Sequence, residues 1–178
     1  MPKLIIYACP IGELAERLDA YFVQSRIACG PNMAHQYMPH CTLTGFFEDT
    51  PSSLSHYVDG LARSLRQHRR SKPQLPVVVT GLTFRKDWHG LELSSDWLQQ
   101  LMRDFANATH SWTRPAPLRL KTWLHLSLAY GFEPAHATTL QQLAKAMINP
   151  ALPVEWELRF YERHVAGTWT CHQRWPLF

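Results

Sequence analysis

Two patterns of apolar residues alternate along the chain. Short runs of continuous or alternating apolar residues are typical of β-strands, and longer segments with apolar positions every three or four residues are typical of amphipathic helices. Their alternation predicts a mixed domain of the α/β or α+β class. Strands are expected over residues 3–9, 40–44, 76–85, 91–94, 123–130, 154–165 and 168–177, and helices over residues 11–28, 51–72, 95–112 and 134–148.

The order of these segments contains a coarse repetition. In each half of the chain, a strand that carries a histidine and a hydroxyl residue is followed by a glycine and then by a helix that starts near a proline. The first copy starts at His40 and the second at His125, with no residue-level repeat beyond these positions. We interpret the repetition as a pseudo-symmetry of architecture. Residues 1–178 are therefore expected to form one domain with two pseudo-symmetric lobes.

Composition narrows the class of ligand. The 178 residues are 46% hydrophobic, which is enough to bury a substantial core. The formal net charge of +4 suits an anionic ligand, but the chain lacks the dense Lys/Arg clustering of proteins that bind genomic nucleic acid. A small phosphate-bearing substrate fits this balance better. Ten histidines supply side chains whose ordinary pKa, about 6.5, allows proton exchange near neutral pH.

Cysteine spacing and hydropathy exclude several other classes. Cys9, Cys29, Cys41 and Cys171 form no Cys-x-x-Cys pair, so neither a zinc ribbon nor a thioredoxin-type motif is present, and reduced thiols are expected. The apolar run at residues 4–8 is too short for a signal-peptide core, and no segment approaches the ~20 apolar residues of a membrane span. The expected protein is cytoplasmic, monomeric and without a membrane partner.

Two short stretches carry the candidate chemistry. Each places a hydroxyl residue two positions after a histidine: Thr42 after His40, and Ser127 after His125. Side chains two apart on a strand point to the same face, so each pair can reach one cavity. If the two strands run side by side at the centre of the fold, two imidazoles face each other across a gap with two hydroxyls beside them. Such a gap could hold one phosphodiester.

This pattern, His-x-Thr followed some 85 residues later by His-x-Ser, resembles the 2H phosphoesterases. The second motif, extended from His125 to Tyr130, looks especially like the plant and yeast type of cyclic phosphodiesterase. In size and element order, the resemblance covers the whole chain. At the level of individual residues, it covers the two motifs and their flanks. It implies a bilobal α+β fold, with antiparallel sheets around a central cleft and helices on the outside, and an enzyme that uses no metal and no cofactor.

The reaction that the resemblance implies is hydrolysis of a ribose cyclic phosphate to a monophosphate. The substrate would be a nucleoside 2′,3′-cyclic phosphate or ADP-ribose 1″,2″-cyclic phosphate. His40 and His125 would act as general base and general acid, in an order that the sequence leaves open. Thr42, Ser127 and Tyr130 would bind the phosphate oxygens.

Several alternatives stay open. Residues 86–90 are expected to form a hairpin loop. Trp88, at the tip of that loop, or Phe84 before it could stack on a nucleobase, although core or hairpin packing is the commoner role of such aromatics. The cyclic phosphate could sit on an RNA 3′ end, or the cleft could bind RNA without turnover. A metallohydrolase is disfavoured, because a zinc or two-metal centre needs three or more converging His, Asp or Glu ligands and neither motif brings an acidic partner.

Overall fold

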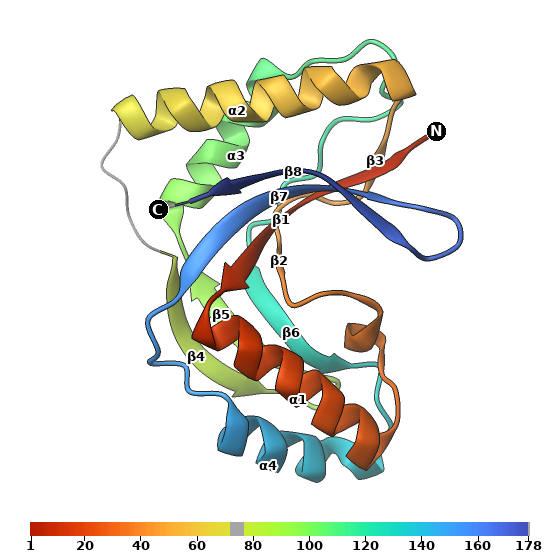
Figure 1. The fold of residues 1–178 in the computed structure, drawn as a ribbon, viewed down its shortest axis with the longest axis vertical. Helices are drawn as coiled ribbons and strands as arrows, with labels where there is room; N and C mark the ends of the chain where they lie inside the picture. The colour runs from red at the N-terminus through yellow and green to blue at the C-terminus, as the bar shows by residue number, and fades with distance from the viewer. Residues whose placement is uncertain (72–76, 178) are drawn as a thin grey trace.

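Strand β1 (Lys3–Ile11) lies inside the sheet of the protein, with β2 and β3 along one edge and β7 along the other (Figure 1). The computed structural model describes residues 1–71 and 77–177. The strand order is β4-β5-β6-β2-β1-β7-β8, and all neighbours are antiparallel, which confirms the predicted α+β class. The remaining strands are β2 (Cys41–Thr42), β3 (Phe47–Glu48), β4 (Val78–Phe84), β5 (Trp88–Ser94), β6 (Leu124–Tyr130), β7 (Glu155–Arg163) and β8 (Trp169–Pro176).

The two faces of β1 pack into different apolar clusters. Alternate residues from Leu4 to Ala8 belong to the main core of the protein. Alternate residues from Ile5 to Cys9 form a smaller cluster with Tyr161 on the opposite face. Because both faces are covered, this strand is a continuous apolar run in the sequence rather than an alternating one.

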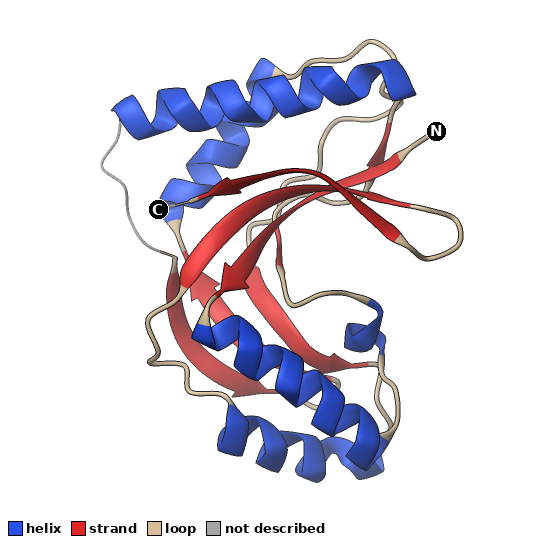
Figure 2. Cartoon of the chain, viewed as in Figure 1, coloured by secondary structure: helices blue, strands red, loops and turns tan. Residues whose placement is uncertain are grey.

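The α-helices of the described residues lie in two pairs at opposite ends of the molecule, with the sheet between them (Figures 1 and 2). Helix α1 (Glu13–Cys29) packs beside α4 (Ala137–Met147), and α2 (Leu54–Ser71) packs beside α3 (Asp96–Ala108). Proline-started 3-10 turns, η2 (Pro51–Ser53) and η3 (Pro134–His136), precede α2 and α4. The predicted repetition of motif strand, proline and helix is therefore present in the structure.

The strand predicted at residues 40–44 is shorter than expected, because only Cys41 and Thr42 pair as β2. At Thr44 the side chain takes the place of the main chain: the Ile6 N–H donates to Thr44 Oγ1 at 3.1 Å. The Ile6 carbonyl accepts from the N–H of Leu43 at 3.0 Å. The hydroxyl interrupts the ladder of main-chain hydrogen bonds, and pairing with β1 resumes only at β3.

Other boundaries differ by a few residues. Strand β5 begins at Trp88, so the loop predicted at residues 86–90 is shorter, although the hairpin itself is confirmed. Helix α3 ends at Ala108 rather than near residue 112. The turn η1 (Met33–Gln36) has no counterpart in the prediction, since it is built on a capping box between Asn32 and His35. Lys72 and Pro76, at the ends of a predicted helix and strand, lie outside the described residues.

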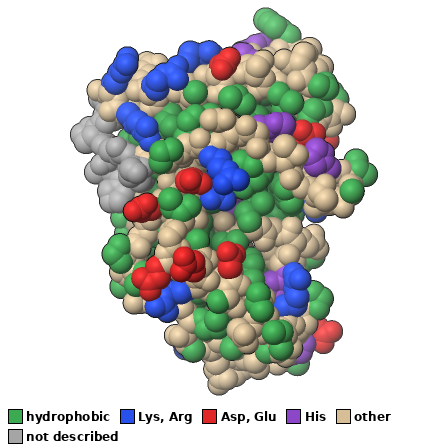
Figure 3. All heavy atoms as spheres, in the orientation of Figure 1, with side chains coloured by type: hydrophobic (Ala, Val, Ile, Leu, Met, Phe, Trp, Pro, Cys, Tyr) green, Lys and Arg blue, Asp and Glu red, His purple; other side chains and the backbone are tan. Residues whose placement is uncertain are grey.

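The basic end of α2 is exposed to solvent. In Figure 3, Lys and Arg side chains gather over the end of the molecule where α2 lies. Arg63, Arg66, Arg69 and Arg70 are the exposed arginines of this helix. No helix of the described residues has the length and apolarity needed to cross a membrane. The four cysteines are free thiols.

Candidate active site

The two motif strands, β2 and β6, lie side by side in antiparallel register, with Cys41 opposite Leu126. Both of these residues are fully buried and belong to the main core. Because side chains alternate along a strand, the residues before and after each of them must point to the other face of the sheet. The arrangement that the sequence required for one shared site, with the motif strands adjacent, is therefore present.

The four motif residues form a block on that face. Continuing the register by one residue in each direction places Thr42 opposite His125, and His40 opposite Ser127. The two imidazoles therefore occupy one diagonal of the block and the two hydroxyls the other. Diagonal neighbours in an antiparallel pair have α-carbons roughly 7–8 Å apart. This spacing leaves room for one phosphate group between two imidazole rings.

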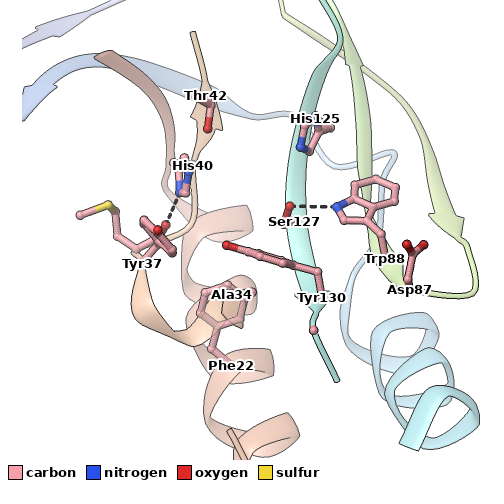
Figure 4. A pocket seen from close by; sticks show the side chains of 12 residues that line it. Phe22, Ala34, Tyr37, His40, Thr42, Asp87, Trp88, His125, Ser127 and Tyr130 are labelled. Atoms are coloured by element: carbon pink, nitrogen blue, oxygen red, sulfur yellow. Dashed lines mark hydrogen bonds between the residues drawn. The ribbon is translucent and has the colours of Figure 1, made fainter. Parts of the chain in front are cut away.

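All four side chains line one cavity of about 520 Å³. In the close-up, His40 and Thr42 approach it from one side, and His125 and Ser127 from β6 on the other (Figure 4). Tyr130 points into the same space with its hydroxyl toward the side on which His40 lies. The structure thus brings together all five residues predicted to act on the phosphate. The rest of the lining is Phe22, Ala34, Tyr37, Met38, Asp87, Trp88 and Gly131.

Both histidines are oriented by the same kind of hydrogen bond. Nδ1 of His40 lies 2.7 Å from the carbonyl oxygen of Met38, and Nδ1 of His125 lies 3.3 Å from that of Trp123. A carbonyl oxygen can only accept, so Nδ1 carries the proton and donates in each ring. In the neutral imidazole the lone pair is then on Nε2. Each Nε2 is therefore available to accept a proton from, or donate one to, a bound substrate.

Each catalytic candidate also lies against an aromatic ring. The ring centroids of Tyr7 and His40 are 3.9 Å apart, and those of Trp123 and His125 are 3.9 Å apart. Burial lowers the pKa of His40 to about 4, against the opposing effect of its bond to the Met38 carbonyl. Burial also lowers the pKa of His125. Both rings are therefore mostly neutral at pH 7 in the absence of an anion.

Trp88 is fixed beside the second motif. Its indole N–H donates to Ser127 Oγ at 2.9 Å, and its ring meets that of His125 edge-on with centroids 5.4 Å apart. A Cβ at Gly90 would lie 2.3 Å from the Leu126 carbonyl oxygen and 2.3 Å from the Trp88 ring. Gly90 therefore provides the space in which the indole folds back toward Ser127. The Trp88 side chain lines the cavity, but it is mostly buried and already occupied by these contacts.

Phe84, the other predicted stacking residue, is not brought to the cavity. It packs against the main core, and its ring lies 5.1 Å from His89 and 5.5 Å from the ammonium of Lys145. It does not belong to the cavity lining. The site therefore offers other aromatic rings, Phe22 and Tyr37, as surfaces for a nucleobase.

Several site residues carry no recognisable signal in the sequence. Tyr37 follows the unpredicted turn η1, and Tyr7 comes from a strand whose apolar pattern indicates only burial. Trp123 is different, because it lies two positions before His125. The spacing rule that groups His125 with Ser127 also places Trp123 near that face, so this residue could have been predicted.

Metal ligands do not gather at this site. Within residues 1–71 and 77–177, no group of three or more His, Cys, Asp or Glu side chains could hold a metal ion. Among the described residues, Asp87 is the one carboxylate in the cavity lining, which otherwise consists of the two histidines and of aromatic, hydroxyl and small or apolar residues. The donor set therefore fits hydrogen bonding to an anion better than coordination of a cation.

Comparison with known proteins gives relatives over most of the chain. It is 30% identical to mouse "Ubiquitin-associated and SH3 domain-containing protein A" over 159 residues, covering 89% of this chain and 25% of that protein. It is 28% identical to the Bombyx mori "Ecdysteroid-phosphate phosphatase" over 167 residues, covering 90% of this chain and 24% of that protein. The chain thus spans about a quarter of the length of these curated relatives. No family model matches.

Two solved structures are similar over nearly the full length. One is a phosphoesterase, at 17% identity and a TM-score of 0.49, covering 99% of this chain and 98% of that chain. The other is E. coli LigT in its apo form, at 15% identity and a TM-score of 0.48, covering 98% and 97%.

The chain resembles the 2H phosphoesterases in two features: its α+β architecture and its paired His-x-Thr and His-x-Ser motifs. The two motifs meet in one cavity, as that resemblance implies.

Proposed function

We propose that this protein is a metal-independent phosphoesterase that hydrolyses ribose cyclic phosphates to monophosphates. The observation that supports this most is the pairing of β2 with β6, which places two Nδ1-protonated imidazoles on one diagonal of a single cavity. Opening a cyclic diester requires a base for the attacking water and an acid for the departing ribose oxygen. Two imidazoles on opposite sides of one phosphorus supply both.

We assign the base to His40 and the acid to His125. His40 is the more enclosed ring, and its low pKa keeps Nε2 free to take a proton from water. The water oxygen bonds to phosphorus, and the bond from phosphorus to one ribose oxygen breaks. Nε2 of His125 gives its proton to that departing oxygen. His125 gains this proton when the substrate binds, since a phosphate anion beside the ring favours the imidazolium.

The hydroxyl residues stabilise the charge on phosphorus. Thr42 and Ser127 occupy the other diagonal of the block, where each can donate a hydrogen bond to a non-bridging oxygen. Ser127 is suited to this role because its oxygen already accepts from Trp88, which leaves its own proton for the substrate. Tyr130, at the end of β6, would contact a phosphate or ribose oxygen.

The experiment that tests this function is turnover of an adenosine 2′,3′-cyclic phosphate in the presence of EDTA. His40→Ala and His125→Ala should each lower kcat by roughly 10²–10⁴-fold, the usual contribution of one general acid or base. His110→Ala is the matched control, because His110 is exposed and lies outside the cavity lining. Loss of activity on chelation, or unchanged turnover in either variant, would contradict the proposal.

Two further substrates separate the alternatives. An ecdysteroid phosphate, the ester in the name of the insect relatives, tests hydrolysis of a simple monoester. Faster turnover of that ester than of the cyclic diester would show that the cyclic substrate is wrong. An oligonucleotide ending in a cyclic phosphate tests RNA-end processing. Tight binding of that oligonucleotide without any product would indicate an RNA-binding module.

A further inference from the structure

A second cavity, of about 230 Å³, adjoins the candidate active site. The two cavities share lining residues from both motifs and from the turn between α1 and β2: Tyr37, His40, Thr42 and Tyr130. A ligand bound at the motif residues can therefore extend into the smaller cavity without leaving the protein surface. The reaction between the two histidines does not account for this second cavity.

The smaller cavity carries two cationic side chains, Arg119 and Lys121. Their segment is held in place by main-chain pairing with the residues after β2. The Gly45 N–H donates to the Arg119 carbonyl at 2.7 Å, and the Lys121 N–H donates to the Leu43 carbonyl at 2.9 Å. Thr44 and Leu120 form the antiparallel bridge between them. The main chain of both residues is thus held along the continuation of the strand that carries Thr42, and their exposed side chains line the cavity.

Gly45 allows the guanidinium of Arg119 to lie close to the backbone. A Cβ at position 45 would come within 3.1 Å of both Nε and one terminal nitrogen of Arg119. The absence of a side chain at position 45 leaves room for the planar group to lie over the backbone there. Arg119 is an exposed side chain, and its contact with the backbone at Gly45 places its guanidinium at the edge of the second cavity.

The charge in this cavity is not balanced by acidic side chains. No Asp or Glu of the described residues lines it, and neither Arg119 nor Lys121 forms an ion pair with a described carboxylate. A third cation lies close by: Arg163 donates to the hydroxyl of Tyr37 at 3.2 Å. Two unpaired cations in a small cavity, with tyrosine and threonine hydroxyls beside them, match a phosphate group.

Arg119 lies too far along the strand to serve the phosphate between the histidines. It pairs opposite Gly45, three residues beyond Thr42, which corresponds to about 10 Å at the usual rise of 3.3 Å per residue. An anion at Arg119 must therefore be a second group of the same ligand or a separate ligand. The shared lining of the two cavities favours the first.

We propose that this cavity binds a second phosphate of the substrate, attached to the 5′ oxygen of the ribose that carries the cyclic phosphate. The inference rests on the proposed function and names its substrate class. Two sources share this chemistry: an RNA 3′ end, where the group is the last phosphodiester, and ADP-ribose cyclic phosphate, where it is the pyrophosphate. A cyclic nucleotide with a free 5′ hydroxyl lacks the group and leaves Arg119 and Lys121 without a partner.

The test compares kcat/KM for adenosine 2′,3′-cyclic phosphate with and without a 5′-phosphate. The wild-type protein should prefer the 5′-phosphorylated substrate by roughly tenfold or more, because it alone makes the charge-assisted contacts. In the double variant Arg119→Gln, Lys121→Gln the ratio should fall to within about twofold of 1. Arg66→Gln, an exposed arginine on α2, is the control and should keep the wild-type ratio.

Equal kcat/KM for the two substrates in the wild-type protein would overturn the proposal, as would a preference that survives the double substitution. A dinucleotide ending in a cyclic phosphate and ADP-ribose cyclic phosphate then identify the source, by which of them the same double variant impairs more.

A binding measurement keeps this result separate from the proposed activity. Calorimetry with adenosine 2′,5′-bisphosphate and adenosine 2′-monophosphate needs no turnover. Tighter binding of the bisphosphate, lost in the double variant, supports the second phosphate site even if no cyclic phosphate is hydrolysed. Equal affinities for the two nucleotides would rule the site out.

Discussion

The indole N–H of Trp88 donates a 2.9 Å hydrogen bond to the hydroxyl oxygen of Ser127. An indole N–H can only donate, so the bond sets which way the serine proton points. The serine proton is then available for a substrate phosphate in the cavity that Ser127 lines. Trp88 is therefore a positioning residue for Ser127, rather than the open stacking surface that its place near a hairpin loop suggested.

Trp88→Phe tests this relationship. The phenyl ring keeps most of the packing but removes the donor, so Ser127 can rotate away from the phosphate. We expect kcat for the cyclic substrate to fall roughly tenfold, the effect of about 1.4 kcal/mol of lost transition-state stabilisation, with KM changed by less than threefold. Trp112→Phe, at a side chain that is 94% exposed, is the control. Wild-type kcat in Trp88→Phe would show that the bond does not orient Ser127.

The pH dependence of kcat/KM follows from the two imidazoles. His40 must be neutral to act as base, and its pKa is lowered to about 4, so activity should fall as pH drops toward 4. His125 must be protonated to act as acid, and burial lowers its pKa from the ordinary 6.5, so activity should already fall as pH rises through values below 6.5. The measurement is a steady-state pH series, which should give a bell with its maximum on the acid side of neutrality. A profile flat from pH 5 to 9 is incompatible with the mechanism.

The profile of kcat should lie at higher pH than that of kcat/KM. The profile of kcat/KM reports the free enzyme, and that of kcat reports the enzyme with substrate bound. A bound phosphate anion stabilises both imidazolium forms and raises their pKa values. Both limbs should therefore move to higher pH in the complex. Limbs at the same pH in the two profiles would mean that the titrating groups do not contact the phosphate.

Asp49 is a buried carboxylate that we assign to stability and not to catalysis. It accepts hydrogen bonds from Tyr57 and Ser111, each at 2.6 Å, and from the Thr50 N–H at 2.7 Å. Asp49→Ala should lower the free energy of unfolding by roughly 2–4 kcal/mol, because it leaves buried donors without an acceptor. Urea denaturation measures this, with the exposed Asp59→Ala as control. Equal midpoints for the two variants would contradict the assignment.

The same carboxylate predicts how stability changes in acid. Its hydroxyl and N–H partners outweigh burial and hold the pKa of Asp49 well below its ordinary value. A carboxylate with a lowered folded-state pKa stabilises the protein at pH values above its unfolded pKa, about 3.9. This contribution is lost as pH falls further. The difference in stability between wild type and Asp49→Ala should therefore be constant from pH 5 to 8 and shrink below about pH 4.

The sequence predicted the parts of the fold that depend on local periodicity. The spacing of His40 and Thr42 fixes a shared face in any extended segment. The helix expected from residue 95 is present as α3, where Ser95 is the N-cap and accepts from the Leu98 N–H. The features that the sequence did not predict depend on strand register and on segments without regular secondary structure. The approach of Trp88 to Ser127 occurs beside a register shift in the β5–β6 pairing, between His89 and Gly90.

The second cavity could not have been predicted for a similar reason. Arg119 and Lys121 lie in an irregular segment before β6, where no period assigns a face. They reach the site only because this segment pairs with the residues after β2. In the linear sequence they are two ordinary basic residues, more than 75 positions from His40.

The most direct measurement of the central claim is a crystal structure of the protein with adenosine 2′-monophosphate bound. Oxygens of one phosphate should lie within about 3.2 Å of Nε2 of both His40 and His125. A phosphate held by only one of the two rings, or bound outside the cavity that they line, would contradict the account.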